Sequence, residues 1–194
     1  MSISLIRWDD HRLVPWKNGL GMTREVANGH RPDGSMLWRV SLATVDRDGP
    51  FSDFTGYKRV IMMLEGEGMR LDFGGHGSAL LDRPFVPVVF DGAWPTSARL
   101  AGGPTRDLNV VTAQRDAASS VAVLPVDGAL DVVGCGLTLV HVLRGKVAAA
   151  AGSLVTGDTL RLDGGDASCT LRADDADALV YRIDIELGRA GSPR

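Results

Sequence analysis

The chain has 194 residues, of which 44% are hydrophobic, and it carries a formal net charge of −3. This length and apolar content suffice for one large domain or two small fused domains. The slightly acidic balance argues against nucleic acid or an anionic membrane surface as a partner, because such partners favour basic proteins.

The first segment, MSISLIRWDDHRLVPW, lacks the basic stretch and hydrophobic run of a secretory signal. The most apolar windows of the chain, RVIMML and FVPVVF, are too short to cross a bilayer. We therefore expect a cytoplasmic protein without a membrane partner.

Short β-rich segments follow one another along the chain, and no window shows the apolar period of a capped helix. They begin with MLWRVSLATV and continue through RVIMMLEG, PFVPVVF, RDLNVVTA and LTLVHVLRG to DALVYRIDIEL. Turn signals such as RDGP, FDGAWP and LDGGDAS separate them. Many short strands at this spacing are typical of an all-β sandwich or barrel.

One strand pattern occurs twice. Residues 59–73, RVIMMLEGEGMRLDF, predict a strand, a glycine-containing hairpin turn and a second strand, and residues 138–152, TLVHVLRGKVAAAAG, have the same form. A separation of about half the chain predicts two similar β-barrel halves. We assign residues 1–114 to an N-terminal barrel and 115–194 to a C-terminal barrel. The second half has fewer polar candidates, so any chemistry is expected in the first.

Strand alternation places polar side chains on one side of several N-terminal strands. Along WRVSLATV, for example, Arg39 faces away from Trp38 and Val40. Two interpretations fit: the polar face meets solvent, or it is the interior of a barrel whose other face is covered by another sheet. The second interpretation predicts a cavity for one small ligand, lined by Thr23, Glu25, Arg39, Arg59, Asp107 and Asn109.

An arginine inside such a cavity needs a partner, because a buried unpaired charge is strongly unfavourable. The partner is either Glu25, Asp107 or an anionic ligand held by a bidentate guanidinium fork. The sequence leaves these three alternatives open.

Common catalytic and cofactor motifs are absent. The GLG motif lacks the third glycine of the dinucleotide fingerprint, and neither GxxxxGK[ST] nor GxSxG occurs. The two cysteines form no CxxC pair and the four histidines form no HxH. We therefore predict no metal, no cofactor and no nucleophilic catalytic residue. A carboxylate pair of Glu25 with Asp91 or Asp107 stays open as an acid–base alternative.

Two loops place tryptophan beside polar residues. Trp16 lies in PWKN and Trp94 lies in DGAWP. The glycines that follow PWKN permit a tight turn, which would carry Trp16, Lys17 and Asn18 to the mouth of a barrel.

Three blocks of the sequence carry a family resemblance. PWKNGLGMTREVA resembles the signature PWKNGGGxTREIA of the HutD/Ves family, and two longer blocks, WRVSLATVDRDGPFSDFTGYKRVIMMLEGEGMRL and PFVPVVFDGAWPTSARLAGGPTRDLNVVT, are similar to the blocks that follow in that family. The resemblance is strong from about Trp8 to Ala113 and thins in the second half. Leu20 stands where the family usually has glycine and adds bulk to the loop.

The resemblance implies a bicupin, meaning two cupin-like β-barrels of the RmlC-like jelly-roll type in one chain. It also implies a regulatory or sensing factor in histidine utilisation, with ligands such as urocanate, formylglutamate or formate, while the Ves branch is linked to environmental stress. Cupins often hold a metal through an HxH motif and a later histidine, and that motif is absent here. Cupin barrels also often associate through sheet edges, so a homodimer is compatible with the resemblance.

Three functions follow from these observations. The one we favour is a metal-free bicupin without catalytic residues that binds a small anionic carboxylate. The second is an enzyme that uses Glu25 or Asp107 as general base, and the third is an interaction protein with a closed barrel. The residues predicted to bind the ligand are Trp16, Lys17, Asn18, Thr23, Glu25, Arg39, Arg59, Trp94, Asp107 and Asn109.

Overall fold

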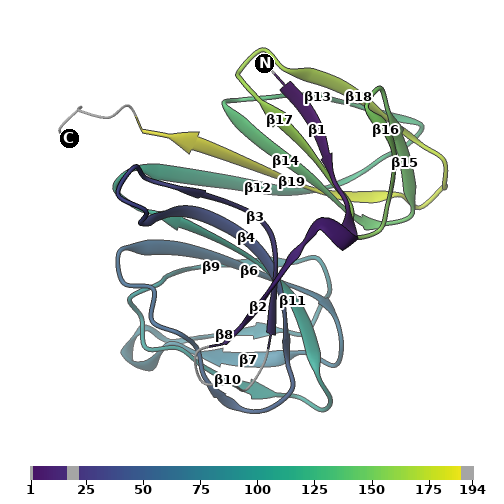
Figure 1. Ribbon diagram of the computed structural model, residues 1–194. Helices are drawn as coiled ribbons and strands as arrows, with labels where there is room; N and C mark the ends of the chain where they lie inside the picture. The colour runs from purple at the N-terminus through teal and green to yellow at the C-terminus, as the bar shows by residue number, and fades with distance from the viewer. Residues whose placement is uncertain (1, 17–21, 189–194) are drawn as a thin grey trace. The chain divides into compact units, whose positions relative to one another are not determined.

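The computed structural model describes residues 2–16 and 22–188. Within these residues the chain forms nineteen β-strands and two short 3-10 helices, η1 (Trp8–Asp10) and η2 (Gly74–His76) (Figure 1). The all-β prediction is therefore confirmed. No helix in this part of the chain is long and apolar enough to cross a membrane.

The strands group into two compact units, which we call the N-terminal unit (residues 12–116) and the C-terminal unit (residues 2–11 and 117–188). The N-terminal unit has a six-stranded and a four-stranded sheet. The six-stranded sheet runs in the order β2 (Arg12–Pro15), β3 (Met22–His30), β4 (Met36–Val45), β11 (Thr105–Ala113), β6 (Tyr57–Glu65) and β9 (Pro87–Asp91). The four-stranded sheet runs in the order β5 (Gly49–Pro50), β10 (Ser97–Leu100), β7 (Met69–Asp72) and β8 (Ser78–Leu81).

The C-terminal unit also consists of two sheets. The five-stranded sheet runs in the order β1 (Ser2–Ile6), β17 (Thr159–Asp163), β14 (Leu137–Arg144), β19 (Leu179–Leu187) and β12 (Ala117–Pro125). The four-stranded sheet runs in the order β13 (Ala129–Val133), β18 (Ser168–Ala173), β15 (Lys146–Ala149) and β16 (Gly152–Val155).

The two units share one topology. The order β4–β11–β6–β9 in the first recurs as β12–β19–β14–β17 in the second, and β5–β10–β7–β8 recurs as β13–β18–β15–β16. Each of these strands thus has a counterpart eight strands later, in the double-sheet arrangement of a jelly roll. The doubling predicted from the sequence reflects this repeat of eight strands.

The predicted hairpins are wrong, because the two strands of each predicted hairpin belong to different sheets and do not pair with each other. Strand β6 pairs with β11 and β9, whereas β7 pairs with β10 and β8. The same holds for β14 and β15. Gly66, with a φ of 111°, lies in the turn where the chain passes between the sheets, and a Cβ there would lie 2.4 Å from the carbonyl oxygen of Pro104. A glycine turn between two strands has the same local sequence whether it closes a hairpin or crosses to a facing sheet.

The first strand belongs to the C-terminal unit, although the sequence analysis grouped residues 1–114 together. Strand β1 pairs along its whole length with β17 (Figure 1). The buried carboxylate of Asp158 secures the segment that follows, because it accepts hydrogen bonds from Arg7 Nη1 (2.8 Å), the Trp8 amide (3.0 Å) and the Val155 amide (3.2 Å). These contacts join sequence positions that no local pattern relates.

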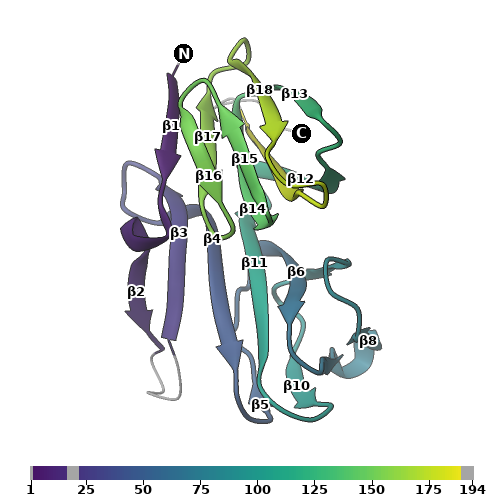
Figure 2. The same cartoon turned by 90° about the vertical axis from the view of Figure 1, so that its right-hand side faces the viewer.

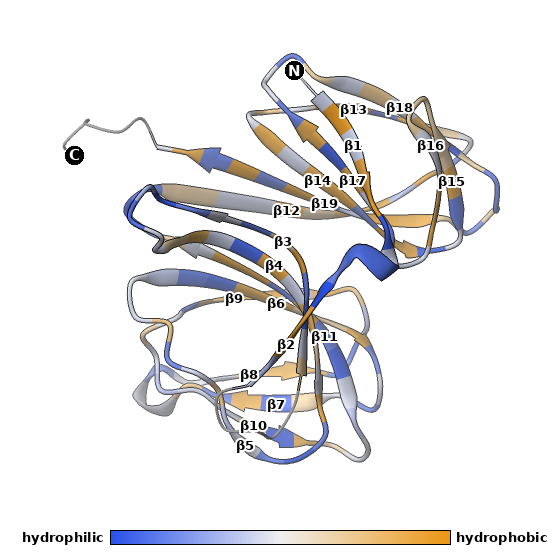
Figure 3. Ribbon diagram, in the orientation of Figure 1, coloured by the Kyte–Doolittle hydropathy of each residue, from blue (hydrophilic) through white to orange (hydrophobic). Residues whose placement is uncertain are grey.

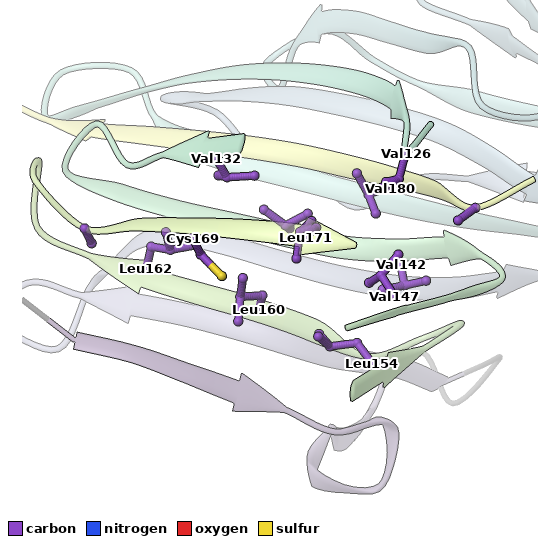
Figure 4. Packing of buried hydrophobic residues seen from close by; sticks show 13 residues of the cluster. Val126, Val132, Val142, Val147, Leu154, Leu160, Leu162, Cys169, Leu171 and Val180 are labelled. Atoms are coloured by element: carbon purple, nitrogen blue, oxygen red, sulfur yellow. The ribbon is translucent and has the colours of Figure 1, made fainter. Parts of the chain in front are cut away.

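Each unit has an apolar core between its two sheets. In the C-terminal unit, the labelled side chains of Figure 4 come from both sheets and point toward one another, among them Leu160 and Val180 from one sheet and Leu171 from the other. Hydrophobic and hydrophilic residues alternate along β19 (Figure 3), as expected for a strand that presents one face to such a core. Burial of one face in this way specifies the pairing register of the strands of the unit.

We expect Asp158→Asn to lower the free energy of unfolding of the C-terminal unit by about 1–3 kcal/mol at pH 7, because an amide nitrogen cannot accept the hydrogen bonds that the carboxylate accepts. Burial by itself raises the pKa of Asp158, but its hydrogen bonds and Arg7 outweigh burial and hold the pKa below the usual value. The stabilisation is thus present above pH 4 and is lost as the pH falls further. Urea unfolding at pH 7 and pH 3 measures the difference between the wild type and the variant.

The exposed Asp166 provides the matched control, since Asp166→Asn should leave unfolding unchanged. Hydrogen–deuterium exchange of residues 2–8 should also become faster in Asp158→Asn. Unaltered exchange in this segment would contradict the assigned role of Asp158.

Candidate functional site

The register of the six-stranded sheet brings six of the ten predicted site residues to one face. Directly paired residues of antiparallel strands point to the same side of a sheet, and Figure 2 shows β3, β4 and β11 side by side. Three rows of paired residues cross this face: Thr23–Ala43–Asp107–Met63, Glu25–Ser41–Asn109–Ile61 and Asn28–Arg39–Val111–Arg59–Phe90.

This face is the inner face of the N-terminal unit. Ile61 and Met63 share it, and both pack in the core cluster with Met69 and Leu71 of β7 in the opposite sheet. Four of the polar residues are also buried, with exposed fractions of 8% for Glu25, 6% for Arg59, 1% for Asp107 and 6% for Asn109. A solvated polar face, the other interpretation of the sequence, does not describe these residues.

Arg59 is the most enclosed cation of this face. Its Nη2 donates to Asn109 Oδ1 at 2.8 Å, while its Nε has no hydrogen-bond partner among the described residues. Its guanidinium carbon lies 5.0–5.2 Å from the ring centroids of Phe51, Phe54 and Phe90, a distance at which aromatic faces attract cations. Burial, aided by the nearby Arg39, lowers the pKa of Arg59 to about 10, although the charge of Asp107 opposes the shift. Arg59 therefore remains charged at neutral pH.

Arg39 lies across β11 from Arg59. Both residues pair with Val111, so their backbones lie two strand spacings apart, roughly 10 Å. The guanidinium carbon of Arg39 lies 5.3 Å from the centroid of the Phe54 ring, which Arg59 also contacts. Burial lowers the pKa of Arg39, against the attraction of Glu25. Its Nε, like that of Arg59, has no hydrogen-bond partner in the described part of the chain.

Asp107 balances this positive charge only indirectly. Its Oδ1 accepts a hydrogen bond from Asn109 Nδ2, and Asn109 in turn accepts from Arg59, so the amide bridges carboxylate and guanidinium. No described residue donates to Oδ2. Burial raises the pKa of Asp107 to about 7, with Arg59 and the Asn109 hydrogen bond acting in the opposite direction.

Glu25, the other carboxylate of this face, is held by neighbours at the sheet edge. Its Oε1 accepts from Arg12 Nη2 (2.8 Å), from Arg12 Nε (3.1 Å) and from the side-chain amide of Asn28. Within the described residues, neither Arg39 nor Arg59 forms an ion pair within 4.0 Å. Of the three partners proposed from sequence for these arginines, neither carboxylate forms a direct ion pair with Arg39 or Arg59 in the described part of the chain, and the anionic ligand stays a prediction.

The remaining predicted residues lie elsewhere or outside the description. Trp16 Nε1 donates a hydrogen bond to Thr23 Oγ1 at 2.8 Å. Lys17 and Asn18 lie outside the described residues. Trp94 stacks on His76 at 4.8 Å and contacts Phe73. No contact joins it directly to the arginines among the described residues, since Phe73 and Phe90 lie between Trp94 and Arg59.

The sequence analysis did not identify the aromatic residues that surround the arginines. Phe51 and Phe54 belong to the segment between β5 and β6, where no strand alternation indicates the direction of a side chain. The signal available was composition alone, because PFSDF places two aromatic residues beside the strand that carries Arg59.

The inner face does not suit the metal that cupin barrels often hold. Two guanidinium groups and an amide occupy the centre of the sheet, and guanidinium groups repel a cation and offer no lone pair. In the described part of the chain, no three His, Cys, Asp or Glu side chains lie close enough to hold a metal ion.

The C-terminal unit has a different arrangement at the corresponding positions. The pair β6–β11 and its counterpart β14–β19 each have one register shift near the end of the pair. Superposing the two strand pairs at this shift aligns Arg59 with Thr138, Asn109 with Arg182 and Val111 with Asp184. There, Arg182 Nε donates to Asp184 Oδ2 at 2.8 Å, and Thr138 donates to Asp184 Oδ1 at 2.6 Å. Arg182 thus has an ion-pair partner on its own strand, whereas Arg39 and Arg59 form no ion pair with any described residue.

Known proteins share both the sequence and the fold. The family model described as HutD matches residues 8–181. An uncharacterized 21.2 kDa protein in the hutC 3′ region of Pseudomonas putida is 42% identical over 113 residues, which make up 57% of this chain and 58% of that protein. The alignment thus spans less than two thirds of the relative.

Solved structures match over nearly the whole chain. HutD from Pseudomonas fluorescens SBW25, in a formate condition, is 28% identical with a TM-score of 0.81, and the match covers 95% of this chain and 100% of that one. A conserved protein of unknown function from Pseudomonas aeruginosa PAO1 is 31% identical with a TM-score of 0.84, covering 96% and 100%. A cupin 2 conserved barrel domain protein from Leptotrichia buccalis, at 10% identity and a TM-score of 0.62 over 96% and 98%, supports the cupin-like fold alone. The chain belongs to the HutD family.

Proposed function

We propose that this protein binds a small carboxylate on the inner face of its N-terminal unit and acts as a regulatory or sensing factor in histidine utilisation. The observation that carries the proposal is the pair of the half-buried Arg39 and the buried Arg59, whose guanidinium groups share the Phe54 ring and lack an ion-pair partner among the described residues. A carboxylate between them would receive charge-assisted hydrogen bonds from both.

The surroundings of the arginines favour an anion over a neutral or cationic ligand. The inner face carries Arg12, Arg39 and Arg59 against Glu25 and Asp107. Burial raises the pKa of Asp107 to about 7, so this carboxyl group is only partly ionised at neutral pH and the positive charge is in excess. The aromatic rings exclude water around Arg59, which strengthens an electrostatic attraction.

The pathway assignment rests on relatives. The Pseudomonas putida relative is described by its place in the hutC 3′ region, and the Pseudomonas fluorescens HutD structure by a formate condition. Small acids of histidine degradation, such as urocanate, formylglutamate and formate, carry the negative charge that the arginine pair would attract. We propose one of them as the ligand.

Two alternatives have less support. An enzyme using Glu25 as general base would need that carboxylate to release Arg12 and Asn28, and Asp107 is almost wholly enclosed. A purely structural barrel would be expected to pair its inner arginines with carboxylates, as Arg182 and Asp184 do in the C-terminal unit.

We expect Arg59→Gln and Arg39→Gln each to weaken carboxylate binding by about thirtyfold or more, because each removes a charge-assisted donor from an enclosed site. Arg59→Lys should restore the charge without the planar fork and recover only part of the affinity. Isothermal titration calorimetry with formate, urocanate and N-formylglutamate measures these changes.

Arg99→Gln is the matched control, since Arg99 is exposed on β10 and lies outside the inner face. The primary amides of the same acids serve as uncharged ligands and should not bind. The proposal fails if no carboxylate binds the wild type at millimolar concentration, or if both arginine variants bind as the wild type does.

We also expect Phe54→Leu to weaken binding between about twofold and thirtyfold, the range of a cation–π contact in a partly dry site. The Phe54 ring contacts both guanidinium groups and should fix their direction, and Leu fills part of the space without a π face. Phe54→Tyr keeps the ring and should bind as the wild type does. Equal affinities for the Leu and Tyr variants would show that the ring does not orient the arginines.

A further inference from the structure

Asp107 is an unusual carboxyl group for the middle of a sheet. It lies on β11 with an exposed fraction of 1%, and its Oδ2 receives no hydrogen bond from any described residue. An ionised oxygen left without a donor in such a place is strongly unfavourable. The group therefore depends on a nearby positive charge or on a proton of its own.

Among the described residues, the charged side chains that share the inner face with Asp107 belong to the six-stranded sheet. Arg59 projects from β6, Arg39 from β4, and Glu25, held by Arg12, from β3. The core residues that the opposite sheet contributes are apolar. They include Met69 and Leu71 of β7, Leu81 of β8 and Ala98 of β10. The ionised form of Asp107 thus relies on Arg59, to which it is linked through Asn109.

A bound anion competes for this same positive charge. Two hydrogen bonds and one side-chain amide separate the guanidinium of Arg59 from the Asp107 carboxylate, a path of roughly 7 Å by ordinary hydrogen-bond lengths. Once a carboxylate neutralises Arg59, an ionised Asp107 would face a second negative charge across a partly dry site. Loss of the Arg59 attraction at this distance, with an effective dielectric constant of about 20, raises the proton affinity of Asp107 by roughly fiftyfold.

We infer that Asp107 takes up a proton from solvent when a carboxylate binds to Arg39 and Arg59, so that the site binds the anion and a proton together. The inference rests on the proposed function, because it concerns the same arginine pair. It makes Asp107 a residue that couples ligand affinity to pH and that disfavours ligands with a second negative charge near β11.

The direction of the pH dependence follows from the ionisation of Asp107. Burial raises the pKa of Asp107 to about 7 in the free protein. Below pH 7 the group is neutral and an anion meets the arginines alone, whereas above pH 7 the ionised carboxylate opposes the anion. Affinity should therefore fall by about tenfold between pH 6 and pH 8.

The test uses formate, which stays ionised throughout this pH range. Calorimetry of the whole chain at pH 7.5, in triethanolamine and in Tris, two cationic buffers that do not compete for the arginines, separates the heat of binding from the heat of buffer ionisation. We expect uptake of roughly 0.7 proton for each formate bound. In Asp107→Asn, which keeps the shape of the side chain, formate should bind with no proton uptake and with equal affinity at pH 6 and pH 8.

His30 and His76, both exposed on the same unit, provide the control variants. His30→Gln and His76→Gln should retain the proton uptake of the wild type. Difference infrared spectroscopy of the wild type, with and without formate, provides a readout that needs no variant. A protonated carboxylic acid band should grow on binding at pH 8.

The outcomes separate this inference from the proposed function. Formate binding with neither proton uptake nor a change between pH 6 and pH 8 overturns the role of Asp107 and leaves the carboxylate site standing. Uptake that persists in Asp107→Asn also overturns it. A wild type that binds no formate overturns the carboxylate site and this inference with it.

Discussion

The N-terminal unit must accommodate two arginines on the inner face of one sheet, the half-buried Arg39 and the buried Arg59, with no ion-pair partner for either among the described residues. Like charges at this spacing repel, and enclosed guanidinium groups lose their hydration. Two kinds of contact offset these costs at Arg59. The rings of Phe51, Phe54 and Phe90 surround its guanidinium group, and the Asn109 amide forms hydrogen bonds with both Arg59 and Asp107. These contacts orient the guanidinium groups, yet the Nε of each has no hydrogen-bond partner among the described residues. Under the proposed function, a bound anion would find these groups already oriented and would need little reorganisation of the protein.

The repeated topology shows that the absence of an ion pair at Arg39 and Arg59 among the described residues depends on the side chains present and not on the jelly-roll fold. Counterpart strands in the two units share their order and the position of a register shift. The C-terminal unit places Arg182, Asp184 and Thr138 in that frame, and these side chains satisfy one another. The N-terminal unit places Arg59 beside an amide instead. The same jelly roll thus supports a closed ion pair in one half and an open cation pair in the other, as expected when sites are built on a fold that does not itself specify them.

Strand alternation predicted which residues share the inner face, because a period of two is a local property of extended backbone. Within each strand it separated Arg39, Arg59, Asp107 and Asn109 from their apolar neighbours, and the pairing of β4, β11 and β6 then brings these residues to one face. Alternation cannot show which side is covered, and it says nothing of contacts between distant segments. The pairing of β1 with β17, the crossing between β6 and β7 and the position of Phe54 all depend on such contacts. The partners of Glu25 and Asp107 escaped the sequence for the same reason, since Arg12 and Asn28 compete for Glu25 only once β2 and β3 are paired.

The residues at the centre of the inner face also explain why this barrel should differ in ligand class from a metal-binding cupin. A divalent cation needs lone pairs from imidazole or carboxylate groups, whereas Arg39 and Arg59 present only donors and positive charge. Asp107 and Glu25 do offer lone pairs, but Asp107 lies beside Arg59 through Asn109, and Glu25 is bound by Arg12. Each carboxylate therefore offsets part of the positive charge of a nearby arginine, which leaves it poorly suited to bind a cation. Replacing imidazole by guanidinium at the centre of the sheet inverts the sign of the charge that the barrel attracts, while the strands that present it remain the same.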